Sequence, residues 1–188
     1  MNLIKRGIAA IFDFLQGIVV FLAILVMIYL FIMSPQEING QSMDPTFHNG
    51  EYILTNKVEY KISDPKRGDV VIFKSPRNKD IDYIKRIIGL PGETIRLSNS
   101  IFYVNNKKLD ESLYLSPDVK TYGGSYLPEN VDITVPAGKY FVCGDNRMHS
   151  SDSREFGPIA KGDFIGKALY RYFPFDRTGV ISNPVYEF

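Results

Sequence analysis

Residues 82–92 have the sequence DYIKRIIGLPG, in which β-branched and aromatic residues lead into a Pro-Gly turn. Tyr and Ile favour extended backbone, whereas Pro and Gly interrupt it, so we predict a strand over residues 83–88 that ends before Pro91-Gly92. Successive side chains of a strand point to opposite faces of a sheet. We therefore expect that Lys85 and Arg86 cannot both point inward, and that one of them faces away.

Similar short runs recur on both sides of this segment and are separated by turn signals. They are residues 52–55, 70–73, 94–97, 101–104, 133–135, 140–142 and 168–173. Asn105-Asn106 could supply the two positive-φ residues of a tight hairpin. We predict a mainly β domain over residues 34–98 and 140–188, antiparallel in most of its pairings, with a small inserted cap or subdomain over residues 99–139.

An apolar N-terminal run precedes this domain. Residues 14–33 carry no charge and match the ~20 residues that a helix needs to cross a bilayer. Lys5 and Arg6 precede the run, whereas the first charges after it are acidic, so the positive-inside rule places residues 1–13 in the cytoplasm and the β domain outside the cell membrane. We predict a single-pass transmembrane helix over residues 14–33, in contact with the lipid bilayer.

A cleaved signal peptide is the alternative interpretation of this run. Its core would exceed the usual ~7 to 15 residues. No small-x-small cleavage site follows Met33, where the sequence reads SPQE. We therefore expect the segment to be retained as an anchor.

Composition excludes several classes of function. The chain of 188 residues has a formal net charge of +1, so we expect no broad basic surface for nucleic acid. It has one cysteine and two histidines, which permit no intrachain disulfide and make a poor set of zinc ligands. We expect neither a metal nor a cofactor, and we expect Cys143 to be a small buried apolar residue.

Ser42 and Lys85 are a candidate pair of nucleophile and base. Pro45 fixes its own φ and biases Asp44 toward extended backbone, so we expect Ser42 on a stiff, non-helical bend. A serine hydroxyl attacks weakly unless a neighbouring base takes its proton. Lys85 has apolar neighbours, and burial can lower a lysine pKa from ~10.4 by up to ~3 to 5. Taken singly, each has a plain alternative: a loop serine beside a proline turn, and a solvated strand lysine.

A polar loop follows the predicted strand that ends near Cys143. Residues 144–154 have the sequence GDNRMHSSDSR. A solvated turn is the plain interpretation, but a neutral lysine amine also needs a hydrogen-bond partner that aims it, and Ser150 or Ser151 could serve. Four charged side chains could pair with one another to brace the loop: Asp145, Arg147, Asp152 and Arg154.

Together these segments resemble the type I signal peptidases of the Gram-positive type. The similarity is carried by four blocks in order, which are SMDPT at 42–46, RGDVVIF at 67–73, YIKRIIGLPG at 83–92, and GDNR at 144–147 with SSDSR at 150–154. Four ordered blocks behind an apolar anchor are far more specific than any one of them.

The resemblance implies a membrane-bound serine endopeptidase that removes N-terminal signal peptides from secretory preproteins. It also implies a mostly β ectodomain that lies against the outer membrane surface. Ser42 would be the nucleophile and Lys85 the general base and then the general acid. Ser150 would position the lysine amine, beside a structural ion pair of Asp152 and Arg154.

The resemblance also implies how the oxyanion and the substrate are bound. Some relatives contribute a serine hydroxyl at the position of Gly40, so we expect the oxyanion hole here to use backbone N–H groups. A small-x-small signal peptide would lie extended between residues 38–41 and 82–84. The residues expected beside it are Ile38, Gln41, Met43, Phe47, Asp82, Tyr83 and Ile84. That most of them belong to the core instead is an open alternative.

Three other functions are weaker explanations of these residues. Ser42 with His149 and an aspartate would make a conventional triad that needs no perturbed lysine. LexA-like self-cleaving repressors share Ser/Lys chemistry, but the apolar anchor is incompatible with their DNA-binding role. A membrane-anchored protein that binds exported chains without cutting them is the non-catalytic alternative, and the presence of both Ser42 and Lys85 argues against it.

Overall fold

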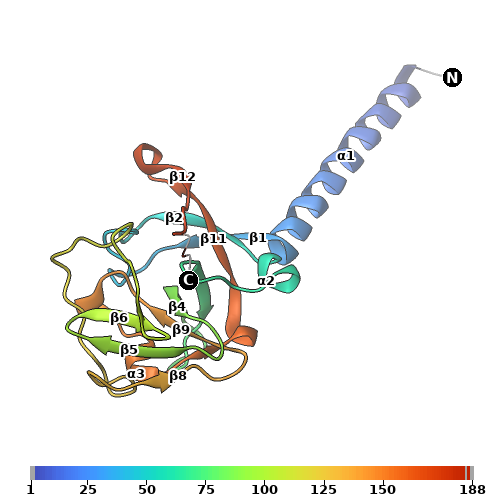
Figure 1. The fold of residues 1–188 in the computed structure, drawn as a ribbon. Helices are drawn as coiled ribbons and strands as arrows, with labels where there is room; N and C mark the ends of the chain where they lie inside the picture. The colour runs from blue at the N-terminus through green and yellow to red at the C-terminus, as the bar shows by residue number, and fades with distance from the viewer. Residues whose placement is uncertain (1–2, 185, 187–188) are drawn as a thin grey trace.

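The structure is a computed structural model that describes residues 3–184 and 186, with side chains from residue 6 onward. One long helix, α1 (Leu3–Phe31), projects from a β body (Figure 1). Met1, Asn2 and the side chain of Lys5, which belong to the predicted cytoplasmic segment, lie outside the described residues. The predicted fold class, a mainly antiparallel β domain behind one N-terminal apolar helix, is confirmed.

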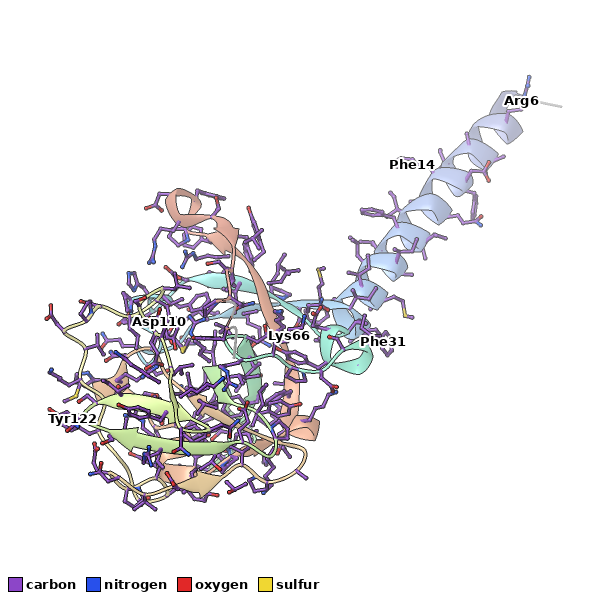
Figure 2. All side chains as sticks on the ribbon, in the orientation of Figure 1. Arg6, Phe14, Phe31, Lys66, Asp110 and Tyr122 are labelled. Atoms are coloured by element: carbon purple, nitrogen blue, oxygen red, sulfur yellow. The ribbon has the colours of Figure 1, made fainter. Side chains whose placement is uncertain are left out.

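The helix α1 is long and apolar enough to cross a membrane. Its 26-residue stretch Arg6–Phe31 is exposed along its whole length, so side chains such as Phe14 point away from the helix without a protein partner (Figure 2). The helix begins at Leu3 and therefore includes much of the predicted cytoplasmic segment, and it ends before Met33. Which of its residues lie within a bilayer stays a prediction.

The C-terminal end of α1 is fastened to the β body by Lys57. The backbone N–H of Lys57 donates to the carbonyl oxygen of Ile32 at 2.8 Å, and its Nζ donates to that of Tyr29 at 3.1 Å. A cation is stabilising at the C-terminal end of a helix, where the last carbonyl groups lack partners. The anchor therefore meets the β body at a defined point.

The larger sheet has eight strands in the described residues, and each of its neighbouring pairs is antiparallel. The strands are β1 (Met33–Glu37), β2 (Tyr52–Asn56), β3 (Val70–Lys74), β4 (Asp82–Gly89), β9 (Lys139–Cys143), β10 (Ile159–Ala160), β11 (Phe164–Phe173) and β12 (Gly179–Val180). Their order is β1-β2-β11-β3-β4-β9-β10, and β12 pairs with β11. The strand β1 is therefore at an edge, and β4 lies inside the sheet.

A smaller sheet covers one face of the larger one. It contains β5 (Thr94–Ser98), β6 (Ile101–Val104), β7 (Lys107–Lys108) and β8 (Ile133–Thr134), in the order β7-β6-β5-β8. Asn105 and Asn106 have φ values of 49° and 64° between β6 and β7, as the predicted tight hairpin requires. This sheet begins at Thr94, before the predicted insert. The boundaries predicted at residues 99 and 139 stay predictions.

Short helical turns connect the strands of the β body. They are α2 (Glu59–Ile62), η1 (Arg147–His149), α3 (Ser153–Phe156), η2 (Lys161–Asp163) and η3 (Phe175–Arg177). The turns η1 and α3 belong to the polar loop that sequence analysis singled out. The loop is therefore a folded segment and not a solvated turn.

The apolar core occupies both faces of the larger sheet. On one face, Ile88 of β4 and Phe141 of β9 pack against Leu97 and Phe102 of the smaller sheet. Cys143 is fully buried in the same cluster, as predicted. A second cluster packs beneath the segment after β1, and a third surrounds the middle of β3. Neither face of β4 is therefore open to water along its centre.

Burial on both faces corrects one prediction. We expected either Lys85 or Arg86 to face away, but only 3% of Lys85 and 1% of Arg86 is exposed. The two side chains do alternate across the strand. Arg86, however, points into the layer formed by the inserted region, where its guanidinium carbon lies 4.1 Å from the ring centroid of Tyr114. The pattern of alternation was right, and the assumption that the second face meets solvent was wrong.

Phe141 joins the two sheets, so its truncation tests the core. Its ring is fully buried and lies edge-on to that of Phe102, with centroids 6.1 Å apart. We expect Phe141→Ala to lower the free energy of unfolding by about 3 to 5 kcal/mol, because the change leaves a cavity. Chemical denaturation of the detergent-solubilised chain measures this effect. Leu113→Ala, at a leucine that is 74% exposed, is the control, and equal effects of the two changes would contradict the assigned core.

Candidate active site

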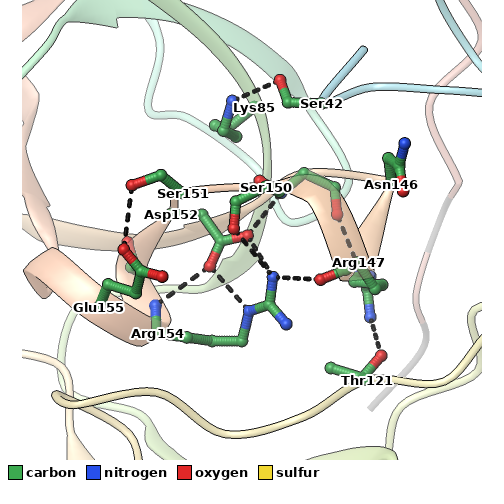
Figure 3. Close-up of polar contacts among 12 residues, drawn as sticks. Ser42, Lys85, Thr121, Asn146, Arg147, Ser150, Ser151, Asp152, Arg154 and Glu155 are labelled. Carbon is green, nitrogen blue, oxygen red and sulfur yellow. Dashed lines mark hydrogen bonds and ion pairs between the residues drawn. The ribbon is translucent and has the colours of Figure 1, made fainter.

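The side chains of Ser42 and Lys85 meet at one end of the larger sheet. Lys85 belongs to β4, and Ser42 lies in the turns that follow β1 (Figure 3). The Lys85 Nζ donates a hydrogen bond to the Ser42 Oγ at 2.7 Å and another to the Ile84 carbonyl oxygen at 2.9 Å. The ring centroid of Tyr83 lies 5.2 Å from the same nitrogen. The serine and the lysine that sequence analysis singled out are therefore in direct contact.

Burial changes the proton affinity of Lys85. Its surroundings exclude the water that would solvate an ammonium ion, and this lowers the pKa of Lys85 to about 8. The carboxylates of Asp152 and Asp145 oppose this change, and the guanidinium of Arg154 adds to it. With this pKa, about a tenth of the lysine amines are neutral at pH 7. A neutral amine can accept a proton, as a general base must.

Ser150 lies beside the site but does not bond to Lys85. Its Oγ is buried and makes no hydrogen bond of normal geometry in the described part of the chain. It faces Gly144, where an added Cβ would lie 2.2 Å from the Ser150 Oγ and 2.3 Å from the Ser42 carbonyl oxygen. Ser151, the alternative partner, donates to a side chain of α3 at 3.2 Å. The role of Ser150 toward the lysine stays a prediction.

Asp152 and Arg154 form a buried bidentate ion pair beside the site (Figure 3). The Arg154 Nε and Nη2 each donate to one carboxylate oxygen of Asp152 at 2.8 Å. The Gly144 N–H also donates to this carboxylate, at 3.1 Å. Burial alone would raise the pKa of Asp152, but the hydrogen bonds and the charge of Arg154 hold it below its usual value. The pair therefore stays charged and holds residues 144–154 in shape.

Asp145 does not pair within its own loop, and this corrects one expectation. Its carboxylate accepts hydrogen bonds from the Arg86 Nε at 3.0 Å and the Arg86 Nη2 at 2.7 Å. Thr46 Oγ1 donates to the same carboxylate at 2.5 Å. One buried side chain thus connects the loop after β9, the strand of Lys85 and the turn of Ser42. The loop lies against both segments, and for this reason its partners come from them.

Arg147 donates to the Gly144 carbonyl oxygen of its own loop at 3.0 Å, but its other side-chain partners lie elsewhere. Its Nη2 donates to the Glu111 Oε1 at 2.5 Å and its Nη1 donates to the Thr121 Oγ1 at 3.1 Å, and both partners lie in the predicted insert. Sequence reasoning missed Glu111, Thr46 and Arg86 as parts of the site. The alternation of side chains along β4 was a signal that Arg86 lies on the face opposite Lys85. No local pattern connects Arg147 to Glu111, which is 36 positions away.

A groove of about 760 Å³ leads to Ser42 and Lys85. Its walls are residues 35–42 and residues 80–85. The strand β9 pairs with β4 only from Arg86 onward, and β1 is an edge strand, so in the described residues both walls present an unpaired strand edge. An extended peptide can pair with such edges. Five of the predicted contact residues line the groove: Ile38, Gln41, Asp82, Tyr83 and Ile84.

Met43 and Phe47 do not line the groove, which corrects their predicted role. Each is only 1% exposed, and both belong to the core cluster that contains Ile53 and Ile72. The Phe47 N–H donates to the Met43 carbonyl oxygen at 2.9 Å, so a single turn brings both residues to the core side. The sequence shows that a turn forms here but not which of its sides faces the protein.

Gly40 and His149 border the groove beside Ser42. Gly40 has a φ of 106°, which favours glycine, and its N–H donates to the Asn49 Oδ1 at 2.8 Å. The Nδ1 of the exposed His149 lies 3.2 Å from the Asn146 Oδ1. The geometry therefore favours Lys85 over His149 as the partner of Ser42. Among the residues that the structure describes, no three His, Cys, Asp or Glu side chains cluster as metal ligands would.

Comparisons with known proteins place this sequence in one family. The sequence model of "Signal peptidase, peptidase S26" matches residues 11–173. Signal peptidase IB of Staphylococcus aureus (strain COL) is 38% identical over 185 residues, which cover 93% of this chain and 95% of the relative. Signal peptidase I of Bacillus amyloliquefaciens is 37% identical over 175 residues, which cover 92% and 90%. A crystal structure of a signal peptidase I from Enterococcus faecalis V583 is 35% identical, with a TM-score of 0.47, and covers 56% of this chain and 97% of its own.

Gly144 leaves no room for a side chain between Ser42 and Ser150. We expect Gly144→Ala to lower the free energy of unfolding by about 1 to 3 kcal/mol, because the added methyl group must push apart the Ser42 carbonyl and the Ser150 hydroxyl. Chemical denaturation measures the change. The matched control is Gly162→Ala, where nothing lies within 4 Å of the added carbon. Unchanged stability of Gly144→Ala would mean that the two serines are not held this closely.

Proposed function

The chain belongs to the signal peptidase family, peptidase S26, whose members are membrane-anchored serine peptidases that remove signal peptides, and we propose that Ser42 and Lys85 are its catalytic dyad. We propose further that it cuts exported preproteins after a small-x-small motif. The observation that supports the dyad most strongly is the 2.7 Å contact between the Lys85 Nζ and the Ser42 Oγ, with only 3% of Lys85 exposed.

The proposed reaction needs only these two side chains and water. As the Ser42 Oγ attacks the scissile carbonyl carbon, its proton passes to the neutral Lys85 Nζ. The ammonium then gives this proton to the leaving amine, the peptide bond breaks, and the acyl group remains on Ser42 as an ester. Lys85 next takes a proton from a water molecule, which attacks the ester, and returns the proton to the departing Ser42 oxygen.

Backbone groups beside Ser42 are suited to hold the oxyanion. In the described part of the chain, the Ser42 N–H donates to no oxygen, so it is available to a developing negative charge. Gly40 has no hydroxyl to contribute, and its own N–H is already bonded to Asn49. We therefore assign the oxyanion to the Ser42 N–H and to no side chain at position 40.

The polar loop would position the lysine. Within the described residues the buried Ser150 hydroxyl makes no hydrogen bond of normal geometry and lies near the Asp152 carboxylate, so it could turn to bind the Lys85 amine when that amine moves from Ser42 toward the leaving group. The Asp152–Arg154 pair holds the loop that carries Ser150. Asp145 and Arg147 connect this loop to the strand of Lys85 and to the insert. These four charged residues act through other groups and are positioning residues.

The groove supports an extended signal peptide as the substrate. Its two unpaired edges could each form main-chain hydrogen bonds with the peptide, which would bind it without regard to sequence. Ile38, Tyr83 and Ile84 give the groove apolar walls close to the reactive pair. Walls of this kind leave space for small side chains near the scissile bond, in agreement with a small-x-small motif.

The anchor supports an orientation with the N-terminus in the cytoplasm and the catalytic domain outside. Arg6 lies near the first end of α1, and basic residues favour the cytoplasmic side. The other end of α1 leads directly into β1, one wall of the groove. We propose residues 34–98 and 140–188 as the catalytic domain and residues 99–139 as its insert. This orientation would place the groove near the surface at which a signal peptide leaves the bilayer.

Replacing the lysine by methionine tests the dyad. Methionine keeps much of the bulk of lysine but cannot carry a proton, so we expect Lys85→Met to lower kcat/KM by about 10²- to 10⁴-fold. The assay incubates a preprotein with the detergent-solubilised full chain and locates the cut by mass spectrometry. Lys139→Met, at an exposed lysine of β9, is the control and should cleave normally. Release of mature protein by Lys85→Met at a near-normal rate would contradict the assignment.

The buried amine also predicts how activity depends on pH. The base must be neutral, and with the pKa of Lys85 at about 8 a lower pH protonates it. We therefore expect kcat/KM to rise about tenfold per pH unit between roughly pH 5.5 and 7 and to level off above about pH 9. The measurement is a pH profile of kcat/KM on a short peptide that does not itself titrate in this range. A profile that is flat from pH 6 to 9 would mean that Lys85 is not the base.

A further inference from the structure

A second hollow opens beside Ser42, on the side of Asn146. It encloses about 450 Å³ and lies between the turn after Ser42, residues 146–149 and residues 118–122 of the insert. Two large side chains in its walls are well exposed, Met148 at 57% and Tyr122 at 54%. Tyr122 lies on the outer side of the β body (Figure 2).

The hollow and the groove share walls. His149 lines both of them. Asn146 lines the hollow, and its N–H donates to the Ser42 carbonyl oxygen at 3.1 Å while its Nδ2 donates to the Gln41 carbonyl oxygen at 3.0 Å. In Figure 3, Ser42 lies between Lys85 and Asn146. A peptide that passes Ser42 on leaving the groove therefore reaches the hollow next.

The directions of β1 and β4 indicate which part of a substrate lies in the groove and which part lies in the hollow. Four antiparallel pairings separate β1 from β4, so the two strands run in the same direction, and both lead toward the reactive pair. The groove between them is lined mainly by the residues that precede Ser42 and Lys85 in these two segments. If it binds the signal peptide, as proposed above, the chain after the scissile bond must leave on the far side. The hollow is on that side.

The charged groups in the walls of the hollow already have partners. Asp145 is paired with Arg86, Arg147 with Glu111, and the Asp44 carboxylate lies 2.6 Å from the His48 Nδ1. The remaining walls are mainly apolar, with Pro45, Val119, Tyr122 and Met148 beside the polar Asn146 and His149. The rim carries one acid and one base, Asp118 and Lys120, whose charges balance.

We propose that the hollow binds the first residues of the mature protein, immediately after the cut, and favours an apolar side chain at one of these positions. The inference rests on the proposed function and extends it to the part of the substrate that follows the scissile bond. It follows from the shared walls, from the direction of the groove and from the apolar lining. It implies that cleavage depends on the mature sequence as well as on the small-x-small motif.

Peptides with one fixed signal-side sequence test this proposal. Each of the first four positions after the scissile bond is varied in turn among Leu, Gly, Asp and Lys, and kcat/KM is measured with the detergent-solubilised full chain. We expect one position to prefer Leu over Gly and Asp by about 10-fold, which is the scale on which an apolar pocket discriminates. The remaining positions should differ much less.

Placing a negative or a positive charge at Met148 tests whether the preference for Leu comes from the hollow. We expect Met148→Asp to remove the preference for Leu and to favour Lys over Asp at the same position, and Met148→Lys to favour Asp over Lys. A loss of folding would not reverse a charge preference. Leu113→Asp is the control, because this leucine is also well exposed but lies outside the hollow, and it should keep the preference of the unchanged protein.

Two kinds of outcome would overturn the proposal, and they are distinguishable. Equal rates for all residues after the cut, or Met148 variants that alter preferences only before the cut, would remove the hollow from the substrate path and leave the Ser42 and Lys85 chemistry intact. Cleavage that persists in Ser42→Ala would overturn the proposed function and this inference with it.

Discussion

The exclusion of water from the Lys85 amine is the constraint on which the rest of the structure depends. An amine in water stays protonated at neutral pH and cannot accept the proton of Ser42. Because 3% of Lys85 is exposed, its pKa lies near 8 instead. Burial of a strand centre on both faces requires a layer on each side, and the smaller sheet and the insert supply the layer that covers Arg86. The insert therefore acts on the site through Arg86 and Arg147, whose guanidinium groups contact Tyr114 and Glu111.

Buried charge pairs fix the three segments of the site relative to one another. Asp145 binds both Arg86, which follows the lysine, and Thr46, which follows the serine. Buried ion pairs of this kind add little net stability, because removing charges from water costs about as much as their attraction returns. Loss of one partner, however, leaves an uncompensated charge. We infer that the Arg86–Asp145 bridge serves geometry, since it resists any motion that would separate Ser42 from Lys85.

The sequence was sufficient for the parts of this protein that depend on local patterns. The strand of Lys85, the Asn105-Asn106 hairpin and the apolar helix α1 follow from residue preferences within a few positions. The partners of Asp145 and Arg147 do not, because they lie 59 and 36 residues away and come together only in the folded chain. The prediction that Lys85 or Arg86 faces away failed for the same reason, because Arg86 is buried. Alternation gives the face on which a side chain lies, whereas the layer that covers this face is formed by distant residues.

The turn after β1 shows how one segment can be both core and site. Met43 and Phe47 are buried beneath it, so their packing holds the turn rigidly while the Ser42 hydroxyl remains at the end of the groove. The turn therefore presents the Ser42 hydroxyl to the groove although neither Met43 nor Phe47 lines it. In the proposed function, selection among signal-side residues then comes from Ile38, Tyr83 and Ile84 on the groove walls. Changes in these walls would alter which side chains fit while leaving the contact between Ser42 and Lys85 intact.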